Sequence, residues 1–266
     1  MNKRFQALQT ETKPLFIPFI MAGDPTPEDT IETALILQEE GANVLELGIP
    51  YSDPLADGPV IQEAAKRAKG MNISKAMELV GKMRQQGLEI PVLIFTYINP
   101  FLRLGEDEFF NLAKQHDVDG LLIPDLPFEE SEQIRARCKM SGISYISLVA
   151  PTTSPKRLET ISQDAQGFLY CVSSLGVTGE RSDFHPETKR LLKEAKSYSS
   201  VPVALGFGIS TRQQFIDVGE VCDGVIIGSS LIRKSHELRN EEPENYKNAF
   251  KSYLSSLVKG EQHINS

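Results

Sequence analysis

The sequence has 266 residues, enough for one large α/β domain or for two domains of ordinary size. Its formal net charge of −8 argues against nucleic acid or an anionic membrane as a partner, because either would need a basic face. Cys138, Cys171 and Cys222 fit neither a disulfide framework nor a paired metal motif, so we expect a reducing, cytoplasmic setting.

The amino-terminal stretch 1–14 has basic residues but no apolar run behind them, so it predicts no signal peptide. We expect one extra helix here, before the first strand. The longest apolar stretches have the length of strands, which excludes a transmembrane helix.

Eight runs rich in β-branched and aromatic residues follow along the chain, and amphipathic helical patterns separate them. The runs span residues 15–23, 42–50, 91–97, 118–127, 143–151, 167–174, 201–208 and 223–230. The first helical pattern has Thr26 as its amino-terminal cap, Pro27 at the first helical position and Gly41 just past its end. Strand and helix repeated eight times predict a single (β/α)8 TIM barrel of the α/β class.

An open, doubly wound sheet is the competing arrangement. The number of runs disfavours it, as does the absence of an early G-x-G-x-x-G motif after the first run. No linker or low-complexity segment divides the chain, so we expect one domain over residues 1–266, with 261–266 as a frayed tail. Residues 236–260 are expected to form the closing helix.

Two connections are longer than usual and follow the second and sixth predicted strands. Residues 51–72 hold a proline-rich loop and an extra helical piece, and residues 174–187 hold glycines and charges. Long loops in a compact domain are usually functional. In a barrel they belong to the carboxyl-terminal face, where barrel enzymes have their active sites.

Glu46 is an acid within the apolar second run. Alternate side chains of a strand share a face, so Leu45 and Leu47 are expected to contact the outer helices while Glu46 points into the barrel. No Lys or Arg occurs in residues 14–65 to keep it charged. Burial should therefore raise its pKa toward neutrality, which suits a group that gives and accepts a proton.

The alternative for Glu46 is a structural role, with hydrogen bonds to backbone or to a tyrosine of a neighbouring strand. Asp57 lies in an Asp-Gly turn, where a solvated acid is the ordinary expectation. Because both acids are placed at the mouth of the barrel, a catalytic pair is favoured over two unrelated residues.

Three glycine-bearing motifs follow strands in the second half, at 176–179, 206–210 and 228–230. We expect Ser210 to cap the helix after the second motif, and exposed amides at such helix starts bind phosphate. Barrels commonly hold phosphate after strands seven and eight. These loops lack a basic cluster, so amides and hydroxyls are expected to hold it; Arg181 is either a further contact or a solvated side chain.

Other reaction classes lack the residues that they need. No predicted strand contains a lysine for a Schiff base, and the histidines lie outside the strands, which argues against a metal site. No nucleophile elbow is present. Acid–base chemistry by carboxylates on a phosphorylated small molecule remains.

The segments "LELGIPYSDPLADGPVIQ", "IPFIMAGDP", "GVTG" and "GFGIS" resemble, in order and spacing, the tryptophan synthase alpha subunit family over essentially the whole chain. The resemblance implies a lyase that cleaves indole-3-glycerol phosphate to indole and glyceraldehyde 3-phosphate without a cofactor. It implies that Glu46 transfers protons, and that Asp57 binds the indole N–H and stabilises the cationic intermediate.

The resemblance also implies a substrate pocket. It is formed by Phe19, Tyr97, Asp125, Tyr170, Thr178 and Phe207, with phosphate contacts from Gly179, Gly206, Gly208, Gly228 and Ser229. Without the resemblance, Phe19 and Phe207 would be read as ordinary core aromatics. Thr178 would cap the site when the 174–187 loop closes. Some family members carry an arginine just before "GVTG", where residues 173–175 are Ser, Ser and Leu in this chain.

A partner is implied as well: a pyridoxal-phosphate beta subunit, in an alpha2beta2 complex through which indole passes by a tunnel. The stretches 51–54 and 97–100, with Asp53, Pro54 and Asn99, match the loops that face it. Rigid substrate loops are an equally good interpretation of these stretches. Two other functions stay open at this point. One is a regulatory barrel with little turnover, and the other is an isomerase or prenyltransferase on the same phosphate-binding scaffold.

Overall fold

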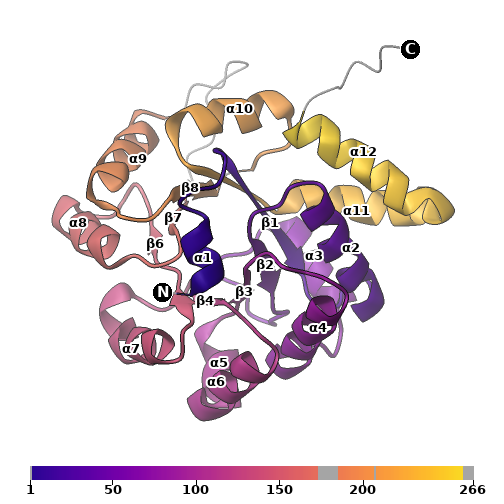
Figure 1. Cartoon of the computed structure of the whole chain (residues 1–266), viewed down its shortest axis with the longest axis horizontal. Coiled ribbons are helices and arrows are strands. Elements are labelled where there is room, and N and C mark those ends of the chain that lie inside the picture. The colour runs from indigo at the N-terminus through magenta and orange to yellow at the C-terminus, as the bar shows by residue number, and fades with distance from the viewer. Residues whose placement is uncertain (1, 173–184, 207, 260–266) are drawn as a thin grey trace.

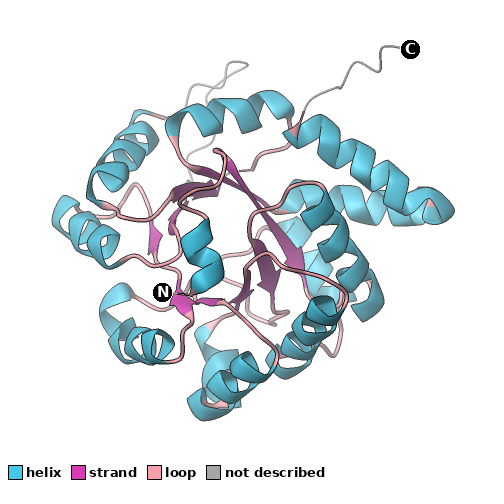
Figure 2. Cartoon of the chain, viewed as in Figure 1, coloured by secondary structure: helices cyan, strands magenta, loops and turns pink. Residues whose placement is uncertain are grey.

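Strands enclosed by a ring of helices make up the computed structural model, which describes residues 2–172, 185–206 and 208–259 (Figures 1 and 2). Neighbouring strands are all parallel, in the order β5-β4-β3-β2-β1-β9-β8-β7-β6. The strands are β1 (Leu15–Met21), β2 (Leu45–Gly48), β3 (Val92–Phe95), β4 (Gly120–Leu122), β5 (Ser144–Tyr145), β6 (Leu148–Val149), β7 (Leu169–Val172), β8 (Val203–Gly206) and β9 (Gly224–Ile227).

The fifth predicted strand is two short strands, and they close the barrel. β5 pairs with β4, and β6 pairs with β7, so the two ends of the strand order meet in one stretch of chain. Between them, the Ile146 N–H donates to the Leu121 carbonyl at 2.9 Å, and the Tyr170 N–H donates to the Ser147 carbonyl at 3.0 Å. The chain therefore forms the predicted (β/α)8 barrel, with one strand interrupted.

Both faces of the strands are covered by apolar side chains, as the continuous apolar runs predict. Val44, the residue just before β2, belongs to the cluster inside the barrel, together with Leu93 and Ile17 of the adjacent strands. Leu45 and Leu47 belong to the cluster between the sheet and the helices. The alternation expected for this strand is confirmed, and it turns Glu46 inward.

The ring is made of helices, and the first of them begins at its predicted cap. They are α2 (Pro27–Glu39), α3 (Pro59–Arg67), α4 (Ile73–Gln85), α5 (Ile98–Leu104), α6 (Glu106–Gln115), α7 (Glu132–Met140), α8 (Pro155–Asp164), α9 (Pro186–Tyr198), α10 (Arg212–Val221), α11 (Ser229–Glu241) and α12 (Tyr246–Val258). Thr26 caps α2 by accepting the Asp29 N–H, and Gly41 follows with a φ of 98°. The extra helical piece expected in the loop after the second strand is α3.

Two helix boundaries differ from the prediction. Thr211, not Ser210, caps α10, because the Thr211 hydroxyl and the Gln214 side chain bond reciprocally to the backbone of the first turn. The expected closing helix is interrupted at Pro243, which lacks the N–H that a continuous helix needs. α11 ends before it, and α12 starts after a short 3-10 turn. The tail 261–266 lies outside the described residues.

The extra amino-terminal helix, α1 (Lys3–Ala7), lies across the barrel at the amino ends of the strands (Figure 1). Its Phe5 is fully buried in the inner cluster. Arg4 donates to the buried carboxylate of Asp119 at 2.9 Å, and Arg84 of α4 binds the other oxygen of the same carboxylate. Among the described residues, no helix is both long enough and apolar enough to cross a membrane.

Candidate active site

A cavity of about 390 Å³ lies at the carboxyl ends of the strands. Its walls come from β1, β7, β8 and β9, from the loop after β2 and from the first turn of α11. They include Phe19, Asp57, Tyr170, Gly206, Gly228 and Ser229. Residues far apart in the sequence therefore meet at the face where barrel enzymes have their active sites.

Glu46 does not line this cavity itself, but its neighbour across the strands, Phe19, does. Glu46 is fully buried on β2, in register with Phe19 of β1 and Leu93 of β3. Neither carboxylate oxygen has a hydrogen-bond partner among the described residues. Burial therefore raises the pKa of Glu46 well above its ordinary value, and no cation in the described part of the chain opposes that shift. The expected inward orientation and raised pKa are both confirmed.

Asp57 lies in the loop between β2 and α3, on the cavity wall. Burial raises the pKa of its carboxyl above the usual value, and a hydrogen bond from the Tyr97 side chain offsets only part of that rise. The Tyr97 hydroxyl also accepts the Ala56 N–H at 3.0 Å. Tyr97 thus fixes the loop next to Asp57 and stabilises the ionised carboxylate.

Tyr170 connects the two acids. Burial raises the pKa of its phenol, and the negative charges of Glu46 and Asp57 raise it further, so both carboxyls lie within electrostatic range of it. Its ring covers Gly206, where a Cβ would stand 2.6 Å from the phenol oxygen. Only glycine at position 206 leaves space for this tyrosine.

Phe19 forms the apolar side of the cavity. Its ring packs edge-on against Phe95, with 5.4 Å between the ring centroids. The ring also lies against Gly48 of β2, on the same strand face as Glu46. A planar apolar group in the cavity would contact this ring while lying close to the buried acid.

Glycines and a helix start form a further part of the wall, and Gly228 lies next to Phe19. Gly206, Gly208, Gly228 and Ser229 all line the cavity, as expected for phosphate contacts. Gly228 is the amino-terminal cap of α11 and makes no side-chain capping bond. The first amides of that helix therefore lack a side-chain acceptor and can bind an anion.

Sequence reasoning missed Arg233, which lines the cavity from α11. The glycine-bearing loops hold no basic cluster, whereas Arg233 lies inside α11, four residues after Ser229. Residues four apart share one helix face, so the spacing of Ser229 and Arg233 could have indicated that both face the site. This inference requires knowing that the helix starts at Ser229.

The other expected pocket residues fall into two groups. Asp125 accepts the Ile98 N–H at 2.9 Å and lines a separate cavity of about 230 Å³, so it is not brought into the main cavity. Thr178, Gly179 and Phe207 lie outside the described residues, as does most of the 174–187 loop. No cluster of His, Cys, Asp or Glu within the described ranges could hold a metal ion.

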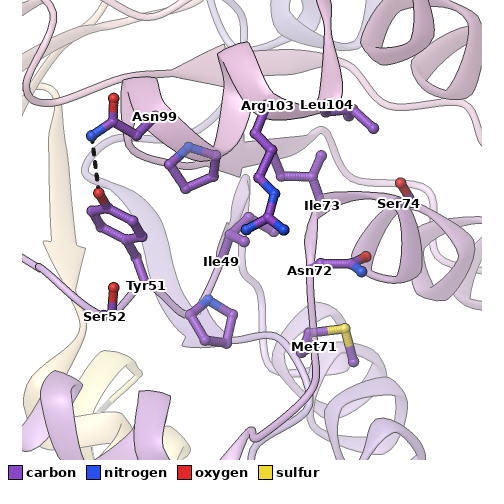
Figure 3. A pocket seen from close by; sticks show the side chains of 12 residues that line it. Ile49, Tyr51, Ser52, Met71, Asn72, Ile73, Ser74, Asn99, Arg103 and Leu104 are labelled. Carbon is purple, nitrogen blue, oxygen red and sulfur yellow. Dashed lines mark hydrogen bonds between the residues drawn. The ribbon is translucent and has the colours of Figure 1, made fainter.

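Asn99, one of the residues expected at the partner face, lines a second cavity of about 630 Å³ together with Tyr51 and Ser52 (Figure 3). The Asn99 amide donates to the Tyr51 hydroxyl at 3.0 Å across its edge. The Tyr51 ring lies 5.2 Å from that of Tyr97, between centroids. Asp53 accepts the hydroxyl of Ser52 at 2.9 Å, and Pro54 lines an adjoining cavity.

Comparison with known proteins agrees with this arrangement. A family model described as tryptophan synthase alpha chain matches residues 5–260. The tryptophan synthase alpha chain of Geobacillus sp. (strain WCH70) is 58% identical over 259 residues, covering 94% of this chain and 98% of that protein. That of Halalkalibacterium halodurans is 53% identical over 262 residues, covering 96% and 98%.

Solved structures give the same result. A crystal structure of tryptophan synthase subunit alpha from Legionella pneumophila has a TM-score of 0.86 at 37% identity, covering 98% of both chains. One chain of the tryptophan synthase complex from Pyrococcus furiosus has a TM-score of 0.81 at 33% identity, covering 91% of this chain and 97% of that one. The matched sequence extends from α1 to α12, and the chain belongs to the tryptophan synthase alpha chain family.

Proposed function

We propose that the chain is a lyase of tryptophan biosynthesis that cleaves indole-3-glycerol phosphate to indole and glyceraldehyde 3-phosphate, with Glu46 and Asp57 as its catalytic residues. Family membership supports the reaction and sets aside an isomerase or a prenyltransferase. The observation that carries the residue assignment is Glu46, a buried acid with no hydrogen-bond partner among the described residues, next to Phe19, which lines a cavity together with Asp57.

The bond to be broken joins an indole ring carbon to the glycerol chain. Cleavage requires a proton on that ring carbon, and it requires removal of the proton from the adjacent glycerol hydroxyl as the aldehyde forms. Glu46 enters the reaction protonated because burial raises its pKa. It gives its proton to the ring carbon, and the resulting carboxylate then takes the hydroxyl proton, so the enzyme ends in its starting state.

Asp57 has a different task. Protonation of the ring carbon places positive charge on the indole nitrogen, and an ionised carboxylate at that nitrogen stabilises the charge. The hydrogen bond from Tyr97 keeps Asp57 more acidic than burial alone would allow. The two acids differ in their surroundings: burial raises both pKa values, but only Asp57 has a donor that opposes the rise.

The substrate is placed with its indole against Phe19 and its phosphate at the glycines and the start of α11. Asp57 and Tyr170 line the same cavity. Asp125, Thr178, Gly179 and Phe207 stay predictions that come from the family pattern. No cofactor is required, because both proton transfers are carried out by side chains.

The deciding experiment measures indole release from indole-3-glycerol phosphate by the purified chain and by Glu46→Gln. We expect Glu46→Gln to retain substrate binding, because its shape is kept, and to lose turnover, because it cannot carry the proton. Glu78→Gln, at an exposed position of α4, is the matched control and should keep full activity. Turnover by Glu46→Gln at the wild-type rate would refute the assignment.

A beta subunit is the proposed partner, in an alpha2beta2 complex. On this chain, the face that docks with the beta subunit would consist of two segments. One is the loop after β2, with Asp53 and Pro54, and the other is α5, which contains Asn99. Two large apolar side chains project from these segments: Leu55 is 88% exposed and Leu102 is 58% exposed. Exposed apolar groups beside a large cavity are typical of a protein interface. Addition of a beta subunit should increase the rate of indole formation.

Two further points belong to the proposal. We expect the whole chain, residues 1–266, to act as one (β/α)8 domain. We also place it in the cytoplasm, which is supported by three buried cysteines that form no disulfide with one another.

A further inference from the structure

One arginine faces the cavity assigned to the substrate. Among the described residues that line this cavity, Arg233 alone carries a positive charge. We propose that its guanidinium binds the phosphate of the substrate and sets the affinity for phosphorylated ligands. This inference rests on the proposed function, because the phosphate-bearing substrate comes from there.

The position of Arg233 on α11 directs its side chain to the phosphate wall. α11 begins at Ser229, and Arg233 is four residues further on, so the two share a helix face. Side chains in a helix tilt toward its amino terminus. The long side chain of Arg233 therefore extends back toward the first turn, where the amides after Gly228 lack a side-chain acceptor.

Arg233 is exposed and makes no hydrogen bond or ion pair with another described residue. The next residue behaves differently: Lys234 pairs with Glu237 at 3.6 Å on the same helix. A cation near the amino end of a helix is disfavoured by the helix dipole unless an anion lies beside it. An unpaired arginine at this place is therefore suited to an anion that arrives with the substrate.

Charge gives Arg233 a role that the amides alone do not fill. A phosphate monoester carries about −1.5 to −2 charges at pH 7. The protein has a net charge of −8, and Asp57 lines the same cavity, so both repel such a group. Amides orient a phosphate, whereas a guanidinium offers a full positive charge and two parallel N–H donors to its oxygens.

The test compares Arg233→Met and Arg233→Lys with the wild type. KM for indole-3-glycerol phosphate and the Kd for inorganic phosphate, measured by calorimetry, should both rise roughly tenfold in Arg233→Met, the effect of one lost charge-assisted hydrogen bond. Arg233→Lys should fall between the two. The kcat should change little, because the phosphate is held equally in the ground and transition states. Lys234→Met is the matched control and should keep both constants.

Salt dependence gives a second readout. Raising ionic strength should weaken phosphate binding by the wild type more than binding by Arg233→Met, because the charge interaction is screened. Arg233→Gln repeats the comparison with a polar side chain, so that misfolding of one variant does not decide the result.

Equal KM and Kd in wild type, Arg233→Met and Arg233→Gln would overturn the inference even if the wild type releases indole. Conversely, phosphate binding that depends on Arg233 in a chain unable to release indole would contradict the proposed function and leave this inference standing. The two failures are therefore distinguishable.

Discussion

The ring of Phe19 lies directly against the backbone of Gly48, so that a Cβ at position 48 would stand 2.3 Å from the ring carbon Cζ. Gly48→Ala must therefore displace a ring that forms the apolar side of the active site. We expect the variant to lose about 1–3 kcal/mol of unfolding free energy, the usual cost of overpacking. KM for indole-3-glycerol phosphate should rise as well. Urea unfolding and steady-state kinetics test both effects, and wild-type values in both would contradict the close contact.

The buried acid makes stability depend on pH. Burial raises the pKa of Glu46 in the folded chain, whereas an unfolded glutamate ionises near about pH 4.3. Between these two pKa values the folded state holds a proton that the unfolded state has released. The contribution of this group to stability therefore falls as pH rises through that window. Glu46→Gln removes the titration, so the variant should gain stability relative to the wild type as pH rises.

Urea unfolding of both proteins from about pH 4 to pH 8 measures this difference. It should be small at the acid end, grow with pH and level off above the pKa of the folded state. Glu78→Gln, at an exposed position, should track the wild type throughout. A difference between Glu46→Gln and the wild type that does not vary with pH would mean that Glu46 titrates alike in both states.

The hydrogen bond from Tyr97 to Asp57 can be removed without changing the shape of the ring. In Tyr97→Phe, burial would act on Asp57 unopposed, and the pKa of Asp57 should rise. Because the ionised carboxylate is the active form, the acid limb of the kcat/KM profile should move to higher pH. We also expect roughly tenfold lower kcat/KM at neutral pH from loss of a hydrogen bond to a charged group.

Tyr51→Phe provides the control for this experiment. It removes the hydroxyl that accepts the Asn99 amide and keeps the ring contact with Tyr97. Its pH profile should coincide with that of the wild type. If both variants shift the acid limb equally, the hydroxyl of Tyr97 has no special effect on Asp57.

Leu55 tests the proposed docking face. It is 88% exposed in the loop after β2, next to Pro54. If a beta subunit covers this side chain, Leu55→Ser should weaken the complex roughly tenfold, through loss of buried apolar area. Met140, which is 80% exposed at the end of α7, provides the control Met140→Ser. Titration of each variant with the beta subunit gives the affinities, and equal affinities would place the interface elsewhere.

Much of the barrel could be predicted because the determining signals are local. Alternation along β2 gave the direction of Glu46, and the absence of nearby cations in the sequence gave the direction of its pKa shift. The cap at Thr26 and the stop at Gly41 were equally clear. These features depend on a residue and its near neighbours in the chain.

What could not be predicted depends on backbone geometry or on contacts between distant segments. Ser210 and Thr211 are both good caps, and only the backbone conformation decides in favour of Thr211. The break in the fifth strand arises because its two halves pair with different neighbours. Arg233 joins the site only because α11 starts at the cavity.

The helix α1 restricts how water, substrate and products reach and leave the buried acid Glu46. Phe5 of α1 fills the amino-terminal end of the barrel. The helix is held there because its Arg4 binds the carboxylate of Asp119, which Arg84 also binds. Among the described residues, the cavity open to substrate and products lies at the other end of the barrel, on the side of the loops. A partner seated over that cavity would control exchange between Glu46 and the surroundings.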